Sequence, residues 1–355
     1  DTIDIADSDL GNTGGGGPLT DSSDVVIALA PTLMEVSTLV DEVDGDVSPQ
    51  DLSLREAITE MTSGGRIVFA PELSGTLSLD SRFGEFTIDK SLIIDGPGAA
   101  LITISGGLDS RIFNVTDGDA SPNKNVVIRG LTLTDGAPGP GLNGGAIDNT
   151  EDLFLDRCVI FGNSAENGGG IYSRGALTLV DCSGSGNSAL DSGGFLLSLP
   201  SETAVIRRST IAGNEAKEGG GIMNVGALLL ENSTLSGNRA TQNGGAIYHG
   251  AAASLVLLNA TVTGNIADAN ATSSGLGGGI FVVTGASPAD LRNCIVAGNF
   301  DTPNNAGGGV VHPDLSGAFE GDHAHGGAEH VGETFGFLLD GAHARRRGGG
   351  VRGRA

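Results

Sequence analysis

A short strand-like phrase that ends in Gly-Asn recurs six times between residues 158 and 299. Three positions before each Asn the residue is apolar in every copy except one, Gly184, and five positions before it the residue is always small. Alternation with a period of two is typical of a β-strand with one buried face. The copies end at Asn163, Asn187, Asn214, Asn238, Asn265 and Asn299.

A second phrase, of glycines followed by an aliphatic residue, accompanies the first, as in GGGIYS at 168–173 and GGGIMN at 219–224. A short apolar segment, such as ALTLV at 176–180, lies between the two phrases. Successive Asn residues are 24, 27, 24, 27 and 34 positions apart, so one period of about 25 residues holds three strands and three turns. This period is too short for a strand-helix-strand crossover or a propeller blade. The pattern therefore predicts a coil of three short strands.

Stacked coils would place equivalent residues roughly 4.8 Å apart along one axis. Each aliphatic column would then be buried by its neighbours in the coils above and below. We expect the six Asn side chains to form a ladder, amide to amide, at one corner, where Asn also tolerates a left-handed backbone. Paired glycines would permit the close turns between strands.

A short amphipathic helix is expected at 53–61, within an N-terminal cap at 33–62. Ser53 followed by Glu56 is a capping-box pattern, and the apolar residues of this segment fall on one helical face. Such a helix would cover the open end of the stack, whose unpaired backbone would otherwise invite edge-to-edge association.

The remaining chain divides by pattern. Residues 63–305 are predicted to form the parallel β-helix, and residues 306–355 an irregular tail rich in His, Arg and Gly. Residues 1–30 contain no coil phrase and resemble the last strands of a sandwich-like repeat, with a leader segment as the alternative. Because the chain starts at Asp1, we expect a piece of a longer protein.

The segment LSLREAI at 52–58, followed by GGRIVFAP, resembles the start of CSLREA-type bacterial proteins, with Leu52 where cysteine usually stands. The GGAI phrases resemble those of polymorphic outer-membrane adhesins and other pectin-lyase-like proteins. The resemblance covers roughly residues 35–310 and implies an all-β fold, a right-handed parallel β-helix, in a secreted or cell-surface protein. It implies no single activity.

The net charge of the chain limits the classes of partner that are expected. The formal net charge of -24 disfavours nucleic acids and anionic membranes, and suits a soluble surface that can hold divalent cations. No apolar run reaches the roughly 18 residues that span a bilayer, so no membrane insertion by this segment is expected. Asp41, Asp44 and Asp46 alternate around a glycine as calcium ligands do, which makes them a candidate calcium site; no other cofactor is predicted.

Function is the least determined property. We expect a monomeric, non-catalytic, adhesive rod that presents lateral loops to a host or matrix surface, either protein or polysaccharide. The alternative is a polysaccharide lyase or glycoside hydrolase, which needs paired carboxylates, or a calcium-binding carboxylate cluster with a basic residue, on one lateral face. Cys158 and Cys182 share a column in adjacent coils, and a stack of small buried residues is favoured there over a disulfide. The residues that such an enzyme could use recur at strand ends, where they are expected to solvate the surface, so no catalytic residue is predicted; they are Asp148, Asp156, Asp181, Arg174, Arg207 and Arg208.

Overall fold

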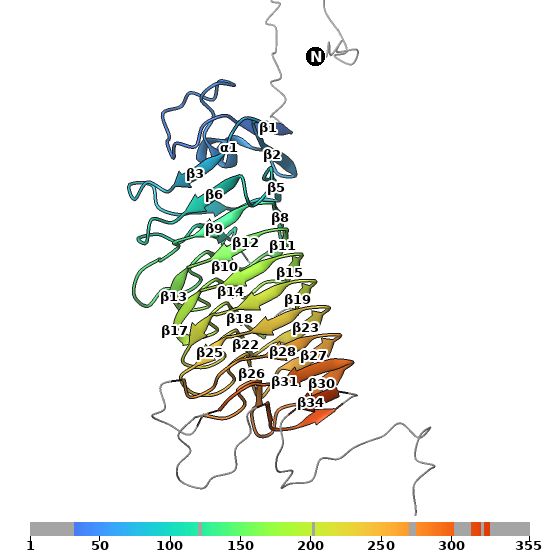
Figure 1. Cartoon of the computed structure of the whole chain (residues 1–355). Helices are drawn as coiled ribbons and strands as arrows, with labels where there is room; N and C mark the ends of the chain where they lie inside the picture. Colours follow the sequence, from blue (N-terminus) through green and yellow to red (C-terminus); the bar gives the residue numbers. More distant parts are fainter. Residues whose placement is uncertain are drawn as a thin grey trace, which may run out of the picture.

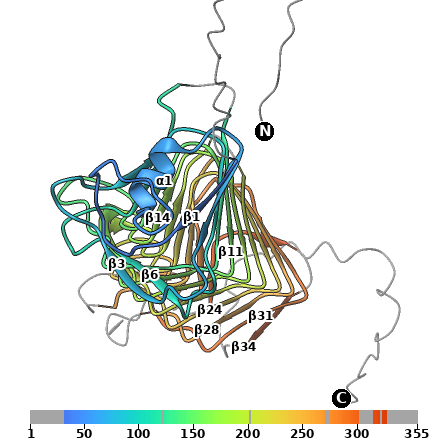
Figure 2. The ribbon, with the colours of Figure 1, turned by 90° about the horizontal axis from the view of Figure 1, so that it is seen from above.

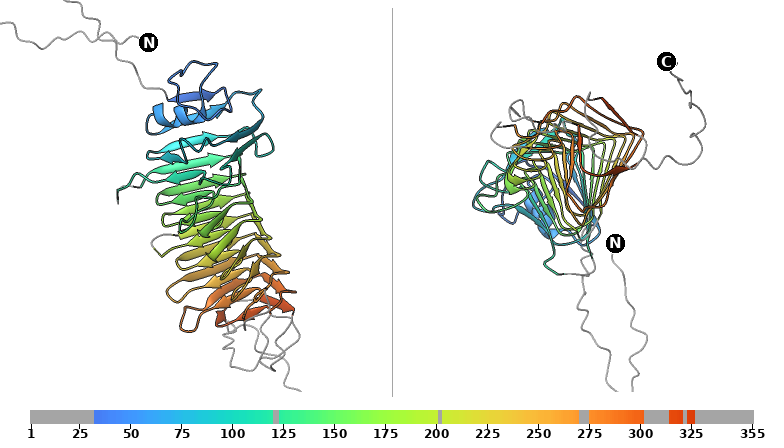
Figure 3. Two further views of the ribbon diagram at one scale, coloured as in Figure 1. Left: turned by 90° about the vertical axis from the view of Figure 1, so that its left-hand side faces the viewer. Right: turned by 90° about the horizontal axis from the view of Figure 1, so that it is seen from below.

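The strands stack in parallel into a rod, as the repeat predicts (Figure 1). Side views show successive turns lying one above another along the axis, and the view from below looks along that axis (Figure 3). The computed structural model describes residues 32–119, 123–200, 203–269, 275–301, 314–320 and 323–326.

Within these residues the strands form three long sheets and one short sheet, which are named sheets A to D. Sheet A contains, in spatial order, β1 (Leu33–Val36), β2 (Gly65–Phe69), β5 (Leu92–Asp95), β8 (Asn125–Arg129), β11 (Asp152–Asp156), β15 (Leu177–Val180), β19 (Thr203–Arg207), β23 (Ala227–Glu231), β27 (Ser254–Leu258), β30 (Ala289–Arg292) and β33 (Phe319–Glu320). Sheet B contains β3 (Gly75–Ser78), β6 (Ile102–Ser105), β9 (Thr132–Thr134), β12 (Val159–Phe161), β16 (Ser183–Ser185), β20 (Thr210–Ala212), β24 (Thr234–Ser236), β28 (Thr261–Thr263), β31 (Cys294–Ala297) and β34 (His323–Gly326).

Sheet C contains β4 (Phe86–Ile88), β7 (Phe113–Val115), β10 (Ile147–Asn149), β14 (Ile171–Ser173), β18 (Leu196–Ser198), β22 (Ile222–Asn224), β26 (Ile247–His249), β29 (Ile280–Val282) and β32 (Leu315–Ser316). Sheet D contains β13 (Ser164–Asn167), β17 (Ser188–Ser192), β21 (Glu215–Ala216) and β25 (Arg239–Ala240). A turn of the rod runs from sheet A to B, then through D in four turns, and on to C. The repeat predicted three strands per turn, so sheet D is an addition that the sequence pattern did not indicate.

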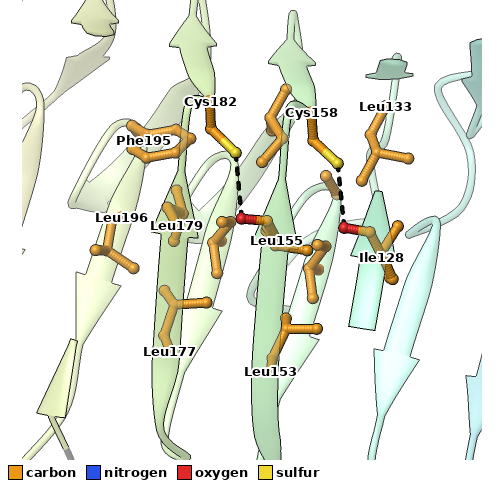
Figure 4. Close-up of a cluster of buried hydrophobic side chains, with 14 of the residues drawn as sticks. Ile128, Leu133, Leu153, Leu155, Cys158, Leu177, Leu179, Cys182, Phe195 and Leu196 are labelled. Carbon is orange, nitrogen blue, oxygen red and sulfur yellow. Dashed lines mark hydrogen bonds between the residues drawn. The ribbon is translucent and has the colours of Figure 1, made fainter. Parts of the chain in front are cut away.

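The interior is filled by columns of aliphatic side chains that match in register from turn to turn. In sheet A, for example, Leu155 pairs with Leu179 and Leu179 with Ile206, and all three are at most 1% exposed. Cys158 and Cys182 lie near this column as free buried thiols whose Sγ atoms approach main-chain carbonyl oxygens (Figure 4). The small buried stack favoured from the sequence is therefore what the structure contains.

Gly184, the exception in the apolar column of sheet B, is explained by a neighbour. Phe195 directly precedes β18, at the position that Gly170 and Gly221 occupy in the adjacent turns. Its ring is fully buried, and a Cβ on Gly184 would lie 2.3 Å from Phe195 Cε2. One large side chain from sheet C thus fills the space that an aliphatic residue of sheet B fills elsewhere (Figure 4).

The expected capping helix is present as α1 (Leu54–Glu60) and packs against β1 and β4 at one end of the stack (Figure 1, Figure 2). Ser53 is its N-cap: Ser53 Oγ accepts from the Glu56 N–H at 3.2 Å, while a Glu56 carboxylate oxygen accepts from the Ser53 N–H at 3.3 Å. The predicted capping box is confirmed. The segment before the helix contains β1, which is the first strand of sheet A and pairs in parallel with β2.

At the other end, the sheets extend beyond the boundary expected at residue 305. β32 pairs with β29, β33 with β30 and β34 with β31, all in parallel. The boundary between 63–305 and 306–355 was therefore placed too early, because the strands past it lack the Gly-Asn phrase. The expectations for residues 1–30 and for residues 327–355 concern parts of the chain that lie outside the described residues.

Candidate binding face

The six asparagines form one buried column at the corner after sheet B. Each Nδ2 donates to Oδ1 of the Asn one turn further on, at 2.8–2.9 Å, from Asn163 through to Asn299. The same Oδ1 also accepts from the main-chain N–H of the preceding Asn, at 2.9–3.1 Å. All six residues are 0–3% exposed. The predicted ladder is confirmed, and its role is structural.

Two residues that the repeat did not reveal close the ladder. At one end the Gly136 N–H donates to Asn163 Oδ1 at 2.8 Å. At the other, Asp314 Oδ1 accepts from both the main-chain N–H and Nδ2 of Asn299, at 3.0 and 2.9 Å. An ionised carboxylate accepts without donating, which suits the last position of such a chain. Asp314 lies only 15 positions after Asn299, so the spacing of the repeat could not point to it.

The left-handed backbone at this corner belongs to glycine, so the expectation that the ladder Asn adopts it was wrong. The glycine before each ladder Asn has φ between +63° and +70°. Glycine has no Cβ to clash in this region, whereas Asn occupies it only at a cost. Non-glycine residues with φ of +47° to +54° occur instead at the corner between sheets A and B: Arg157, Asp181, Arg208, Asn232, Asn259 and Asn293.

The candidate calcium ligands do not form a cluster. Asp41 is 6% exposed; its carboxylate accepts from Arg55 Nε and Nη2 at 2.6 and 2.9 Å, and from the Asp80 N–H at 2.8 Å. Asp44 Oδ1 accepts from the Asp46 N–H at 2.8 Å within an exposed turn. Among the described residues, no group of three or more His, Cys, Asp or Glu side chains is arranged to hold a metal ion. Asp41 instead joins the loop to the capping helix.

The candidate catalytic side chains fall into two groups, and each forms an ion pair: Asp148 and Arg174 lie at sheet C, whereas the other four lie at the corner between sheets A and B on adjacent turns. Asp148 lies on the outer face of sheet C, Asp156 ends β11, and Asp181 lies at the corner between sheets A and B. The pairs, with N–O distances of 2.8–3.0 Å, are Asp148–Arg174, Asp156–Arg157, Asp181–Arg208 and Arg207–Glu231.

The outer face of sheet C carries a continuous row of large apolar side chains, which we name the sheet C row. Its members occupy the central position of five successive strands and are paired in register from one turn to the next. Leu197 is only 7% exposed although it points outward, and the Tyr248 and Phe281 rings lie 5.1 Å apart between centroids. The members of the row are Tyr172, Leu197, Met223, Tyr248 and Phe281.

A polar column runs beside this row, one residue before the glycine turn that leads into each strand of sheet C. Gly219, for example, has φ +61°, and a Cβ there would lie 2.4 Å from the Ile222 carbonyl oxygen. Glu218 directly precedes this tight turn, which leads into β22. Five of the six positions in the column are polar and the last is apolar: Asn143, Asn167, Ser192, Glu218, Asn243 and Leu276.

Glu218 is therefore the one carboxylate in a neutral column. Burial raises the pKa of Glu218 and the nearby Asp191 raises it further, while Lys217 and the Asn243 side chain oppose the rise. Lys217 itself pairs with Asp191 at 3.0 Å. Burial and the Glu218 carboxylate together raise the pKa of Tyr248.

Near Tyr172, at the other end of the row, charged side chains form ion pairs with one another. Arg111, 7% exposed, donates from Nη1 to Glu85 Oε2 at 2.6 Å, and its Nη2 lies 3.9 Å from Asp148. Arg174 donates to Asp148 at 3.0 Å, and its guanidinium carbon lies 5.5 Å from the centre of the Tyr172 ring. Cation–π contact and ion pairing together hold this end in one arrangement.

Sequence reasoning missed the sheet C row, although a signal for it was present. The fifth residue of each six-residue glycine phrase is Tyr172, Leu197, Met223, Tyr248 or Phe281. Alignment of those phrases would have revealed an outward column of large side chains. The outward direction follows from the period of two, because the residue before each is buried.

Residues 81–299 match the family model described as "Right handed beta helix region". Neither the search of curated proteins nor the search of solved structures returned a match. No helix of the described residues has the length and apolarity needed to cross a bilayer.

Proposed function

The chain belongs to the right-handed β-helix family, and from that premise we propose that it is a non-catalytic, secreted or cell-surface rod that binds a partner through the sheet C row. The observation that carries the proposal is the row itself, which presents large apolar side chains on five successive turns. Four of these side chains are half-buried and Leu197 is 7% exposed, so the row is a strip of partly accessible apolar surface. Contiguous apolar surface on a soluble protein marks interaction sites.

Rigidity supports the same proposal. The ladder and the aliphatic columns tie each turn to the next, so the five side chains are held at fixed spacing before any partner arrives. Preorganisation of this kind increases affinity because little conformational entropy is lost on binding. Display outside the cell rests on the resemblance to CSLREA-type proteins and polymorphic outer-membrane adhesins, and on the net charge of -24.

Binding and catalysis are separated by one experiment. The protein is incubated with immobilised matrix proteins and with acidic polysaccharides, and both retention and the release of unsaturated or reducing products are measured. We expect retention without products, and weaker retention for Tyr172→Ser, because Tyr172 is a half-buried member of the row. Thr234→Ser on the outer face of sheet B is the matched control.

Two results would overturn the proposal. If no material retains the protein, or if Tyr172→Ser and the control bind as strongly as the wild type, the sheet C row does not mediate adhesion. If products appear and a single change at Asp148 or Arg174 abolishes them, the lyase or hydrolase alternative is correct. Immunodetection on intact cells, before and after protease treatment, tests the surface location.

A further inference from the structure

We infer that the outer face of sheet A is an interface with a second copy of this chain, in which two antiparallel rods pack with sheet A against sheet A. The strands of this sheet run down one side of the rod (Figure 1). No helix of the described residues covers that side, because α1 packs on the end of the stack (Figure 2). The inference goes beyond the proposed function, which concerns sheet C, and it replaces the monomer expected from the sequence.

The centre of this face is an apolar column that extends over seven turns. Its side chains point outward, because the residues before and after each of them are buried. All seven are half-buried, so contact with a partner would remove further apolar area from water. Six are apolar and one is threonine, and in register order they are Ile93, Val127, Phe154, Thr178, Val205, Leu229 and Val256.

A charged column runs beside the apolar column, two residues further along each strand. It is interrupted once, by Val180 on β15. Reading outward from Val180, the charges are negative, positive and negative in one direction, and positive then negative in the other. In register order the members are Asp95, Arg129, Asp156, Val180, Arg207 and Glu231. The two halves of the column therefore carry opposite charges at equal distances from Val180.

A twofold axis at Val180, parallel to β15, makes these two halves meet. Such an axis reverses the rod and keeps the direction of the strands, so a turn above Val180 faces the turn equally far below it in the second copy. Asp156 then faces Arg207 of the second copy. Arg129 faces Glu231 of the second copy, and by symmetry each of these pairs occurs twice. Complementary charges of this kind direct association and fix its register.

The apolar column is complementary under the same axis. Thr178 lies on the axis and faces its own counterpart. Phe154 faces Val205, and Leu229 faces Val127, so a larger side chain lies opposite a smaller one on each turn next to the centre. Side chains of unequal size allow two facing sheets to interdigitate.

The charged column also excludes the neighbouring registers. Sliding one copy by one turn places Arg129 over Arg207. The same shift places Asp95 over Glu231, so like charges meet at both positions. A shift by one turn in the other direction places Asp156 over Glu231. Like charges that face each other across an interface cost free energy, so one register is preferred.

Ion pairs within one copy set this pattern before docking. Arg207 lies 2.9 Å from Glu231, and Arg129 lies 3.1 Å from Asp95. Side chains that are already held lose little conformational entropy on association. The corner residues beyond the strands are exposed and form ion pairs of their own, so they stay outside the contact: Arg157, Asp181 and Arg208.

The size of the face suits a reversible dimer. Strands β2 to β30 of sheet A extend about 40 Å along the axis, and each strand extends about 16 Å across it. The contact is then about 650 Å² per copy, somewhat below the roughly 800 Å² per partner of a standard interface. At both ends Arg66 faces Asp290 of the second copy, which adds a further pair of opposite charges. We expect a dimer that dissociates on dilution.

Complementary charge reversal tests the pairing. Sedimentation velocity over a range of concentrations is measured for the wild type, for Asp156→Lys, for Arg207→Glu and for an equimolar mixture of the two variants. Each variant alone places like charges opposite each other twice, so we expect its self-association to weaken at least tenfold. In the mixed dimer one contact is native and the other is reversed but still complementary, so the mixture should recover the association of the wild type.

Two further variants control for general effects of charge and folding. Glu215→Lys reverses an exposed charge on sheet D, away from the face, and should associate as the wild type does. All variants are checked for an unchanged melting temperature. If Asp156→Lys or Arg207→Glu melts lower, the pair Arg129→Glu and Glu231→Lys takes its place in the same mixing experiment.

The register is tested with a short bis-maleimide. Val180 faces its own counterpart, so Val180→Cys should give a covalent dimer. Val256 lies three turns from the axis and faces Ile93, so two Val256→Cys copies should not be joined. The natural cysteines are buried, and the wild type should therefore remain uncrosslinked.

The inference is overturned if the wild type sediments as a monomer at every attainable concentration. It is equally overturned if the mixture of folded variants does not recover the association, or if Val256→Cys is crosslinked as readily as Val180→Cys. These outcomes leave the proposed function untouched, because adhesion is measured through Tyr172→Ser on sheet C. A dimer through sheet A would leave both sheet C rows uncovered and present them together, which would increase avidity.

Discussion

Asn214 lies in the middle of the ladder, and its replacement by Leu removes the hydrogen bonds while nearly preserving the branched shape. Asn214 is fully buried. Its Nδ2 donates to Asn238 Oδ1 at 2.9 Å and to the Gly184 carbonyl at 3.1 Å. Its Oδ1 accepts from the N–H and Nδ2 of Asn187 at 3.0 and 2.9 Å. The substitution therefore eliminates four contacts.

The free-energy cost follows from the groups left without partners. Two donors of Asn187, itself fully buried, lose their acceptor. Asn238 Oδ1 keeps the bond from the Asn214 main-chain N–H, so it remains satisfied. An unsatisfied buried polar group costs about 1–3 kcal/mol, and two of them cost about 2–6 kcal/mol. At about 2–4 °C per kcal/mol, the melting temperature should fall by no less than about 4 °C.

The assay combines thermal melting with hydrogen exchange. Melting, followed by circular dichroism, reports the global loss, and exchange at the Asn187 amide reports the local one, because that N–H loses its acceptor. Asn232→Gly is the control: Asn232 is exposed, has φ +52°, and forms part of a surface Asn pair with Asn259 at 3.2 Å. Glycine accepts this backbone conformation without strain. If Asn214→Leu melts no lower than this control and Asn187 stays protected, the reasoning about the ladder is refuted.

Three further predictions concern Phe195 in the core, the buried His249 of sheet C and Ser53, the N-cap of α1. Phe195→Ala should cost about 3–5 kcal/mol in denaturant unfolding, and the double change Phe195→Gly with Gly184→Ile, which copies the adjacent turns, should be less destabilised than either single change. Strictly additive losses would contradict this coupling. Burial lowers the pKa of His249 from its ordinary 6.5, against an opposing hydrogen bond to a main-chain carbonyl. The unfolded chain then binds a proton that the folded chain excludes, so this contribution to stability is complete above pH 6.5 and is lost as pH falls below it. His249→Asn should lose less stability than the wild type between pH 7.5 and 5, and equal losses would rule out this role. Ser53→Ala should lower the free energy of unfolding by about 0.5–2 kcal/mol while Ser53→Thr stays near the wild type; equal losses would show that the cap bond is unimportant.

The buried His249 ends β26 in sheet C, at the position that Asn224 occupies one turn earlier. His249 Nε2 lies 3.1 Å from the Ser287 carbonyl oxygen, and Nδ1 lies 3.1 Å from Asn224 Nδ2. A neutral ring with its proton on Nε2 satisfies both contacts, since Nε2 then donates to the carbonyl and Nδ1 accepts from the amide. The lowered pKa keeps the ring in this form.

The sequence alone determined the features that repeat. The period, the inner aliphatic columns and the six ladder residues were all predictable, because stacking places each residue on its own counterpart one turn away. The capping helix was predictable from Ser53 and Glu56, since a capping box joins residues three positions apart. These interactions depend on local spacing or on exact repetition, both of which are visible in one dimension.

Tertiary structure decided the departures from the repeat. Phe195 compensates for Gly184 across the interior, Asp314 ends the ladder, and Asp41 pairs with Arg55 where sequence spacing indicated a metal loop. Each contact joins different residue types at separations that no period specifies. The path of the backbone through the turns, which periodicity does not encode, brings them together.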